Sequence, residues 1–314
     1  MDVAEPVSQP PPRAPTRAEA FRFWLKLGFI SFGGPAGQIA IMHRELVDER
    51  RWISERRFLH ALNYCMLLPG PEATQLATYL GWLLHRTRGG LVAGTLFVLP
   101  SLAILSTLAW IYLRWGHVPA IAGALSGVKP VVVAIVLHAA WRIGRRTLRH
   151  PLLWAIAVAA FVALEGFDVP FPAIVVGAAL AGAALARVEP RAFSGSIGHA
   201  SGVGAHAPAV IDDDTPTPPH ARWSARRFVA VVAIFVAIWG AAFGALVATF
   251  GANGTLAAMG WFFTKAALVT FGGAYAVLPY IVQHAVDHQG WLTASQMIDG
   301  LALGETTPGP LIMV

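Results

Sequence analysis

The chain has 314 residues, of which 56% are hydrophobic and only 13% are charged, and its mean hydropathy is +0.58. A typical soluble domain is about 25% charged, so this composition excludes a soluble globular protein and indicates an integral membrane protein. The net charge of +6 comes from short basic clusters between apolar runs, which is typical of membrane orientation signals and not of nucleic-acid binding. The single Cys65 excludes an intrachain disulfide.

Several uncharged runs are long enough, at about 20 residues, to cross a bilayer as helices. These runs are apolar on every face, whereas strands of a membrane barrel would alternate with a period of two. We therefore predict an all-α integral membrane protein, a polytopic helical bundle.

The first quarter of the chain contains two interrupted apolar segments. Residues 1–18 are rich in proline and are predicted to be a disordered cytoplasmic tail. The segment Glu19–Met42 is interrupted at Gly33-Gly34-Pro35, and the segment Phe58–Leu84 is interrupted at Pro69-Gly70-Pro71. Between them we expect a charged loop.

Plainer apolar spans follow. We predict membrane helices at Leu91–Leu113, Val118–Trp141, Leu152–Leu164, Val169–Ala186 and Phe228–Phe250. Residues 188–225 are rich in Gly, Ser, Pro and Asp, which predicts a polar linker between two membrane halves.

Both interruptions return near the C-terminus at the same spacing. Phe32-Gly33-Gly34-Pro35 corresponds to Phe271-Gly272-Gly273, and Leu68-Pro69-Gly70-Pro71 corresponds to Thr307-Pro308-Gly309-Pro310. We interpret this register as an internal repeat. Residues 19–187 then form the first repeat, and residues 226–314 form an incomplete second repeat.

The two copies are predicted to have opposite orientations in the membrane. Five plain spans separate them, and the broken segments of the first copy contribute an even number of crossings whether they cross or re-enter. The loop of the first copy contains five arginines, whereas the equivalent loop, Val282–Trp291, contains no Lys or Arg. Inverted repeats with broken helices are the architecture of secondary transporters, which bind substrate near the bilayer midplane.

The breaks supply the groups that an anion needs. Backbone amides at Gly33, Gly34, Gly272 and Gly273 and the half-helix N-termini beside them would carry partial positive charge. Two structural alternatives stay open, because Gly pairs also serve as helix-packing surfaces and proline kinks are common in membrane helices. The recurrence of both elements at one spacing favours a functional site.

The candidate substrate path also includes side chains. The three lysines lie in apolar segments and would set a positive field, the two acids could carry a proton or gate the path, and the neutral polar residues could donate to an oxyanion. These residues are Lys26, Lys129 and Lys265, Glu72 and Glu305, and Gln75, Thr306 and Thr307, beside the break residues Pro69, Gly70, Pro71, Pro308, Gly309 and Pro310. In the alternative interpretation, Lys26 extends to the interface, the acids face a wet vestibule, and the polar groups satisfy backbone atoms freed at the breaks.

The sequence contains no phosphate-binding loop, zinc-type spacing or nucleophile elbow. We therefore predict no enzymatic activity, no cofactor and no metal site. Uphill transport would draw on an ion gradient or on the membrane potential.

With these motifs, including Arg51-Trp52-Ile53-Ser54 and Gly290-Trp291-Leu292-Thr293, the chain resembles the chromate ion transporter family. The resemblance covers residues from about 19 to 314, except for the linker. It implies chromate efflux across the bacterial inner membrane, with chromate resistance as the outcome. Sulfate is the related dianion, no nucleic acid is expected, and a homodimer stays open.

Alternatives to coupled chromate transport are a sulfate or other anion transporter, an uncoupled channel, and an inactive truncated membrane subunit. The last arises because symmetry with the first repeat predicts on the order of a hundred residues beyond Val314.

Overall fold

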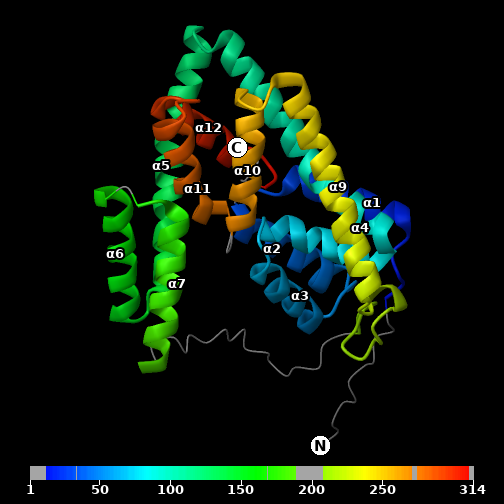
Figure 1. Cartoon of the computed structure of the whole chain (residues 1–314). Helices are drawn as coiled ribbons and strands as arrows, with labels where there is room; N and C mark the ends of the chain where they lie inside the picture. Colours follow the sequence, from blue (N-terminus) through cyan, green and yellow to red (C-terminus); the bar gives the residue numbers. More distant parts are fainter. Residues whose placement is uncertain (1–11, 33, 168, 189–207, 271–273, 311–314) are drawn as a thin grey trace, which may run out of the picture. The chain divides into compact units, whose positions relative to one another are not determined.

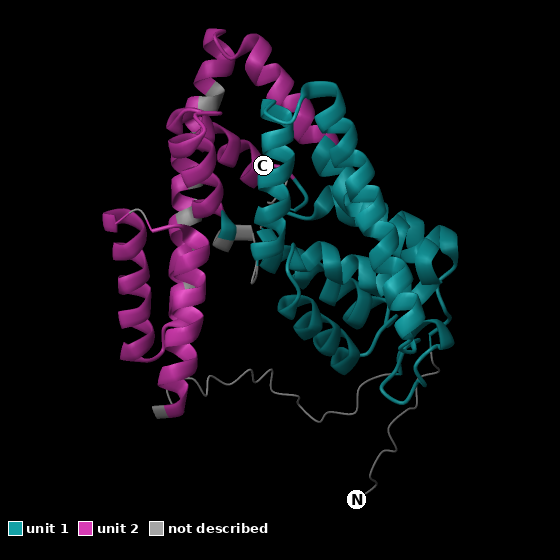
Figure 2. Cartoon of the chain, in the orientation of Figure 1, with its two compact units in different colours: residues 1–102, 206–277, 308–313 teal, residues 103–205, 278–307, 314 magenta. Residues whose placement is uncertain are grey.

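The computed structural model describes residues 12–32, 34–167, 169–188, 208–270 and 274–310. Within these ranges the regular secondary structure is helical, apart from an isolated β-bridge between Ile53 and Ile211 (Figure 1). The predicted all-α membrane fold is thus confirmed. Two compact units divide the chain (Figure 2): residues 1–102, 206–277 and 308–313 form unit 1, and residues 103–205, 278–307 and 314 form unit 2.

The first broken segment of unit 1 is a helical hairpin. Helix α1 spans Arg17–Ile30, and Thr16 starts it with a capping box to Glu19. After the break, α2 spans Gly34–His43 and continues as a π-helix, η1, over Arg44–Glu49. The two arms are antiparallel, because Gln38 contacts Ser31 near the tip while Arg50 lies over the Phe23 ring farther down. The predicted charged loop is therefore partly helical.

The second broken segment forms a similar hairpin. Helix α3 spans Glu55–Leu67, with Ser54 as its N-cap, and α4 spans Glu72–Trp115. Helix α4 has non-helical backbone angles at His85 and Arg86, where it turns back on itself. A Cβ atom at Gly81 would lie 2.6 Å from the Gly89 carbonyl oxygen, so the two limbs of α4 touch through backbone. The second limb contains the predicted Leu91–Leu113 span.

Large apolar side chains from both hairpins form one core. Trp24 and Leu27 of α1, Phe58 of α3 and Leu76 and Phe97 of α4 are all almost fully buried there. A Cβ atom at Gly28 would lie 2.2 Å from the Leu96 carbonyl oxygen, which shows how closely α1 packs on the second limb of α4. The core thus holds the two hairpins together.

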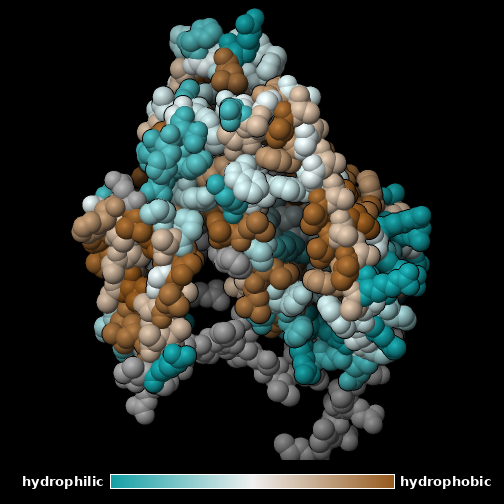
Figure 3. Space-filling model, viewed as in Figure 1, coloured by the Kyte–Doolittle hydropathy of each residue, from teal (hydrophilic) through white to brown (hydrophobic). Residues whose placement is uncertain are grey.

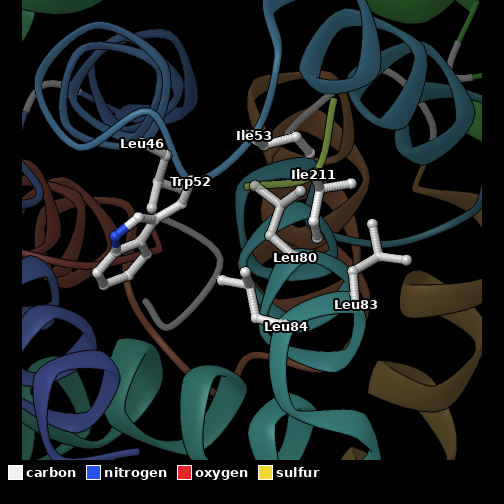
Figure 4. A pocket seen from close by; sticks show the side chains of 7 residues that line it. All are labelled: Leu46, Trp52, Ile53, Leu80, Leu83, Leu84 and Ile211. Carbon is white, nitrogen blue, oxygen red and sulfur yellow. The ribbon is translucent and has the colours of Figure 1, made fainter. Parts of the chain in front are cut away.

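Residues 208–224, which we call the strap, dock on the loop between the hairpins. The Val210 amide donates to the Arg51 carbonyl at 2.9 Å, and the Ser54 amide donates to the Ile211 carbonyl at 2.9 Å. Ile211 completes a small apolar pocket with residues of η1, the loop and α4, as Figure 4 shows: Leu46, Trp52, Ile53, Leu80, Leu83 and Leu84. The polar linker predicted at 188–225 therefore includes a segment packed against the first repeat, where the apolar Ile211 lines this pocket.

Two further apolar helices belong to unit 1. After the short 3-10 helix η2 (Pro219–Ala221), α9 spans Ala225–Phe250 and α10 spans Thr255–Val269. They pack as an antiparallel pair in which the Trp239 indole donates to Thr264 at 3.0 Å. The outward side chains of α9 are apolar (Figure 3), including Phe228, Phe235 and Ile238. Among the described residues, α4 and α9 are long and apolar enough to cross a membrane.

Unit 2 contains the rest of α4 and the remaining apolar helices. These are α5 (Pro119–Thr147), α6 (Pro151–Phe167) and α7 (Phe171–Val188), followed by most of α11 (Ala274–Val282), the π-helix η3 (Gln283–His288) and α12 (Ala294–Thr306). Helix α6 packs on α7, and α12 packs on α5. The Tyr112 hydroxyl donates to Asp299 of α12 at 3.1 Å.

Candidate functional site

The first break of one repeat meets the second break of the other within unit 1. Ser31 ends α1 with its carbonyl unused by the helix, and the Gly309 amide donates to that oxygen at 2.8 Å. Gln38, which is 1% exposed, donates its side-chain amide to the Gly309 carbonyl at 2.5 Å. Residues almost a chain length apart in sequence thus satisfy each other's buried backbone groups.

The same contact occurs a second time with the repeats exchanged. Thr270 ends α10, and its carbonyl accepts the Gly70 amide at 2.8 Å. In the register that pairs Phe32 with Phe271, Ser31 corresponds to Thr270 and Gly70 corresponds to Gly309. We call these two hydrogen bonds the crossed break contacts.

Local backbone structure also recurs at this register. The π-helices η1 and η3 occupy equivalent residues, and α3 and α12 start and end at equivalent residues. Gly70 and Gly309 have φ angles of 117° and 112°. The hydroxyls of Ser31 and Thr270 each donate to the carbonyl four residues earlier at 2.6 Å, which closes the helix end before the break.

The break glycines sit where a side chain has little room. A Cβ atom at Gly309 would lie 2.4 Å from the Cβ of Ser101, which is 1% exposed. A Cβ atom at Gly70 would lie 2.8 Å from the Gln75 amide nitrogen. Both positions also have a positive φ angle that residues other than glycine rarely adopt.

The predicted residues around the first Pro-Gly-Pro element lie close to one another. Gln75 donates to the Pro69 carbonyl at 2.6 Å, across the break. Glu72 is 7% exposed and begins α4, where its carboxylate complements the positive end of the helix dipole. Gly70 and Pro71 lie between Pro69 and Glu72, and Pro69 is exposed. Gln75 thus has a structural partner, as the alternative interpretation of the polar residues expects.

The second Pro-Gly-Pro element follows the end of α12. The hydroxyls of Thr306 and Thr307 donate to carbonyls of their own helix, Thr306 to Ala302 at 2.9 Å and Thr307 to Gly304 at 3.1 Å. Both hydroxyls therefore serve the helix end here. Pro308, Gly309 and Pro310 are buried, and Glu305 is partly buried.

The three predicted lysines have different surroundings. Lys26 forms an ion pair with Glu45 at 2.5 Å, and the Lys265 ammonium lies 5.9 Å from the centre of the Trp261 ring. Lys129 lies in α5, one residue before Pro130, but its side chain lies outside the described part of the structure. Gly33, Gly272 and Gly273 are also outside the described residues, whereas Gly34 is buried with a φ of 66°.

Burial opposes ionisation of Glu45, but hydrogen bonds from Lys26 and Arg50 outweigh it and lower the pKa of this carboxyl below its usual value. Glu45 is therefore an anion held by two cations at the base of the first hairpin. It was not among the residues predicted from sequence.

Sequence reasoning also missed Ser31, Thr270 and Gln38. The repeat register offers a signal for the first two, because a hydroxyl residue precedes the Phe-Gly-Gly element in both copies. It offers none for Gln38, whose equivalent is the buried Val277.

Two pairs of helix ends are joined here through backbone groups, Ser31 with Gly309 and Thr270 with Gly70. In unit 1, α2 and α4 begin at breaks, and helix N-termini favour negative charge. The Gly70 and Gly309 amides are engaged in the crossed break contacts, so an anion would take other donors or replace these bonds. The chemistry of these groups suits binding of an anion and exchange of hydrogen bonds with it.

The chain is similar in sequence to several named transport proteins. The chain is 33% identical to a chromate transport protein of Pseudomonas aeruginosa over 97% of its length, and 29% identical to a probable chromate transport protein of Synechococcus elongatus over 93%. It is 28% identical to a chromate transport protein of Cupriavidus metallidurans over 95%. The chain covers 66% of each of these relatives, so it spans about two thirds of their length.

No solved structure matches the chain significantly. The chromate transporter family matches residues 18–183 and 257–314, which include all four breaks and most of the chain. The chain therefore belongs to the chromate transporter family.

Proposed function

We propose that this chain transports chromate out of the bacterial cytoplasm across the inner membrane, driven by an ion gradient or by the membrane potential. Its relatives named as chromate transport proteins support the substrate class, and sulfate is a second candidate because it is also a tetrahedral dianion. The observation that carries the proposal is the pair of crossed break contacts, Gly309 to Ser31 and Gly70 to Thr270. Backbone breaks at membrane depth are tolerated where they are buried in protein or line a water-filled path.

The dimensions of the first repeat support re-entrant hairpins. At 1.5 Å per residue, α1 and α3 are each about 20 Å long, which is too short for a hydrocarbon core of about 30 Å. The open ends of both hairpins lie together: a ring nitrogen of His85 is 3.0 Å from the Pro15 carbonyl, and the strap pairs with the loop that starts α3. Both hairpins therefore enter from one end of unit 1.

The helices that follow the strap support opposite entry of the second repeat. Helix α9 begins beside the strap, where Arg227 donates to the His220 carbonyl, and its 26 residues extend about 39 Å. Helix α10 then runs back along α9 and ends at Thr270. The equivalent helices α1 and α10 thus start at opposite ends of unit 1. This arrangement supports inverted repeats whose breaks meet at mid-depth, where secondary transporters bind substrate.

Charge supports a cytoplasmic position for one end of unit 1. The end of unit 1 with the strap contains five arginines of the inter-hairpin loop, and the positive-inside rule assigns such an end to the cytoplasm. An anion leaving the cytoplasm would meet this end first.

Radiolabelled chromate uptake into inside-out vesicles tests the proposal. We expect saturable uptake that is competed by sulfate and that responds to an imposed pH gradient or membrane potential. Uptake that follows only the anion gradient would instead indicate a channel. Absence of uptake, with the chain inserted at normal levels, would reject transport by this chain. A Gly240→Ala variant is the matched control, because a Cβ atom there meets nothing within 4 Å.

A further inference from the structure

Three charged side chains form a compact cluster at the base of the first hairpin. The Lys26 ammonium lies 2.5 Å from Oε1 of Glu45, and Nε of Arg50 lies 3.1 Å from Oε2 of the same carboxylate. Each carboxylate oxygen thus accepts from a different cation. A tetrahedral oxyanion would bridge the same two cations through two of its oxygens.

The exposure of the three side chains differs sharply. The Glu45 side chain is 3% exposed, whereas those of Lys26 and Arg50 are 53% and 36% exposed. The carboxylate is therefore on the inner side of the cluster, and the cations separate it from solvent. An incoming anion can reach both cations while Glu45 remains behind them.

Aromatic rings fix one of the cations in place. The Arg50 guanidinium lies 5.3 Å from the centre of the Phe23 ring and 5.2 Å from that of the Trp52 ring. Contact with both rings limits the motion of the guanidinium, so little conformational entropy is lost when it binds an anion.

The donors of the cluster exceed what Glu45 uses. Lysine has three N–H donors and arginine has five, and the bonds to Glu45 take one from each. The three charges sum to a net charge of +1, which balances only one of the two negative charges of a dianion. Removal of the Glu45 charge would leave two cations opposite two negative charges.

We propose that Lys26 and Arg50 form a capture site for a divalent tetrahedral oxyanion, and that Glu45 is a tethered competitor that keeps its affinity low. This inference rests on the proposed function for the identity of the ligand. A weak capture site suits transport, because an anion that binds too tightly at the entrance does not move on.

The cluster is specific to the first repeat. At the equivalent positions, Lys265 is retained, but His284 and Gln289 replace Glu45 and Arg50. Neither the competing carboxylate nor the second permanent cation recurs. The capture site therefore belongs to the end of unit 1 that carries the arginine-rich loop.

Equilibrium binding of sulfate to the purified full chain in detergent tests this inference. We expect Glu45→Gln to bind sulfate about tenfold more tightly than the unmodified chain, because a nearby like charge is removed. The matched control is Glu49→Gln, which lies in the same π-helix but pairs with Arg44 on the surface at 3.4 Å. This control should leave sulfate affinity within about twofold.

A double variant, Lys26→Gln with Glu45→Gln, should lose the tightened binding. Unchanged or weaker sulfate binding in a Glu45→Gln protein that still unfolds cooperatively would overturn the capture site. If Glu45→Gln aggregates, Glu45→Ala and Lys26→Gln are measured instead, and sulfate affinity equal to that of the unmodified chain in a folded Lys26→Gln protein overturns the site.

The outcomes separate this inference from the proposed function. Tightened sulfate binding without any anion flux in vesicles would uphold the site and reject transport. Saturable chromate flux with sulfate affinity unaltered by Glu45→Gln would do the reverse.

Discussion

The amide of Gly70 donates to the carbonyl of Thr270, and this hydrogen bond of 2.8 Å is matched by an equal one from Gly309 to Ser31. Each repeat therefore completes the broken helix of the other. A movement of either first-repeat hairpin relative to its partner residue in the second repeat must break or exchange one of these bonds.

Gly309→Ala should abolish most chromate flux and destabilise the protein by about 1–3 kcal/mol, because alanine is strained at a φ of 112° and its Cβ would meet Ser101. Gly70→Ala should have a similar effect at the other contact. Vesicle flux and thermal unfolding in detergent measure the two consequences. Flux at the level of Gly240→Ala in either variant would contradict a role for the crossed break contacts.

The lowered pKa of Glu45 predicts that the stability of the protein depends on pH. Its pKa is lowered below the usual 4.5, so ionised Glu45 stabilises the fold fully above that pH, and this contribution is lost as pH falls through the lower, folded-state pKa. We expect the unfolding temperature to fall below pH of about 4.5, and to fall less steeply in Glu45→Gln. Identical pH profiles for the two proteins, with Glu49→Gln as a further comparison, would show that Glu45 contributes nothing.

Ile211→Asp should release the strap. The charge would enter an apolar pocket in which Ile211 is 8% exposed, so the docked segment becomes unfavourable. We expect trypsin to cleave at Arg222 at least several-fold faster. Thr217→Asp is the control, since Thr217 is exposed in the same segment. Equal cleavage rates in the two variants would mean that the pocket does not hold the strap.

Lys129→Gln should abolish anion flux while insertion remains normal. Inserting a lysine in the middle of an apolar membrane helix costs at least about 2.5–3.5 kcal/mol. A charged residue at such a position therefore points to a functional role. Lys129→Arg should keep part of the flux because it keeps the charge. Chromate uptake per inserted molecule is the measurement, and normal uptake by Lys129→Gln removes this residue from the substrate path.

Sequence patterns predicted the helical membrane fold, the positions of both breaks in the first repeat, and the family. These features depend on local properties: apolar length, proline and glycine at the breaks, and a repeated register. The second break was visible because Pro69 and Pro71 lack the backbone N–H that a continuing helix needs.

Contacts between distant residues were not predictable in the same way. Gln38 reaches Gly309 from a position whose equivalent is Val277, so symmetry gives no indication of it. The strap lies in a segment whose composition indicates a linker, and one apolar residue, Ile211, is enough to dock it. The pairing of Lys26 with Glu45 likewise depends on how α1 and η1 meet in space.

The crossed break contacts also set an order of events during synthesis. Ser31 emerges from the ribosome early, but the amide that satisfies its carbonyl belongs to Gly309, near the other end of the chain. At about 5–20 residues per second, the first hairpin waits on the order of tens of seconds for this partner. This crossed break contact can therefore form only after residue 309 has been translated.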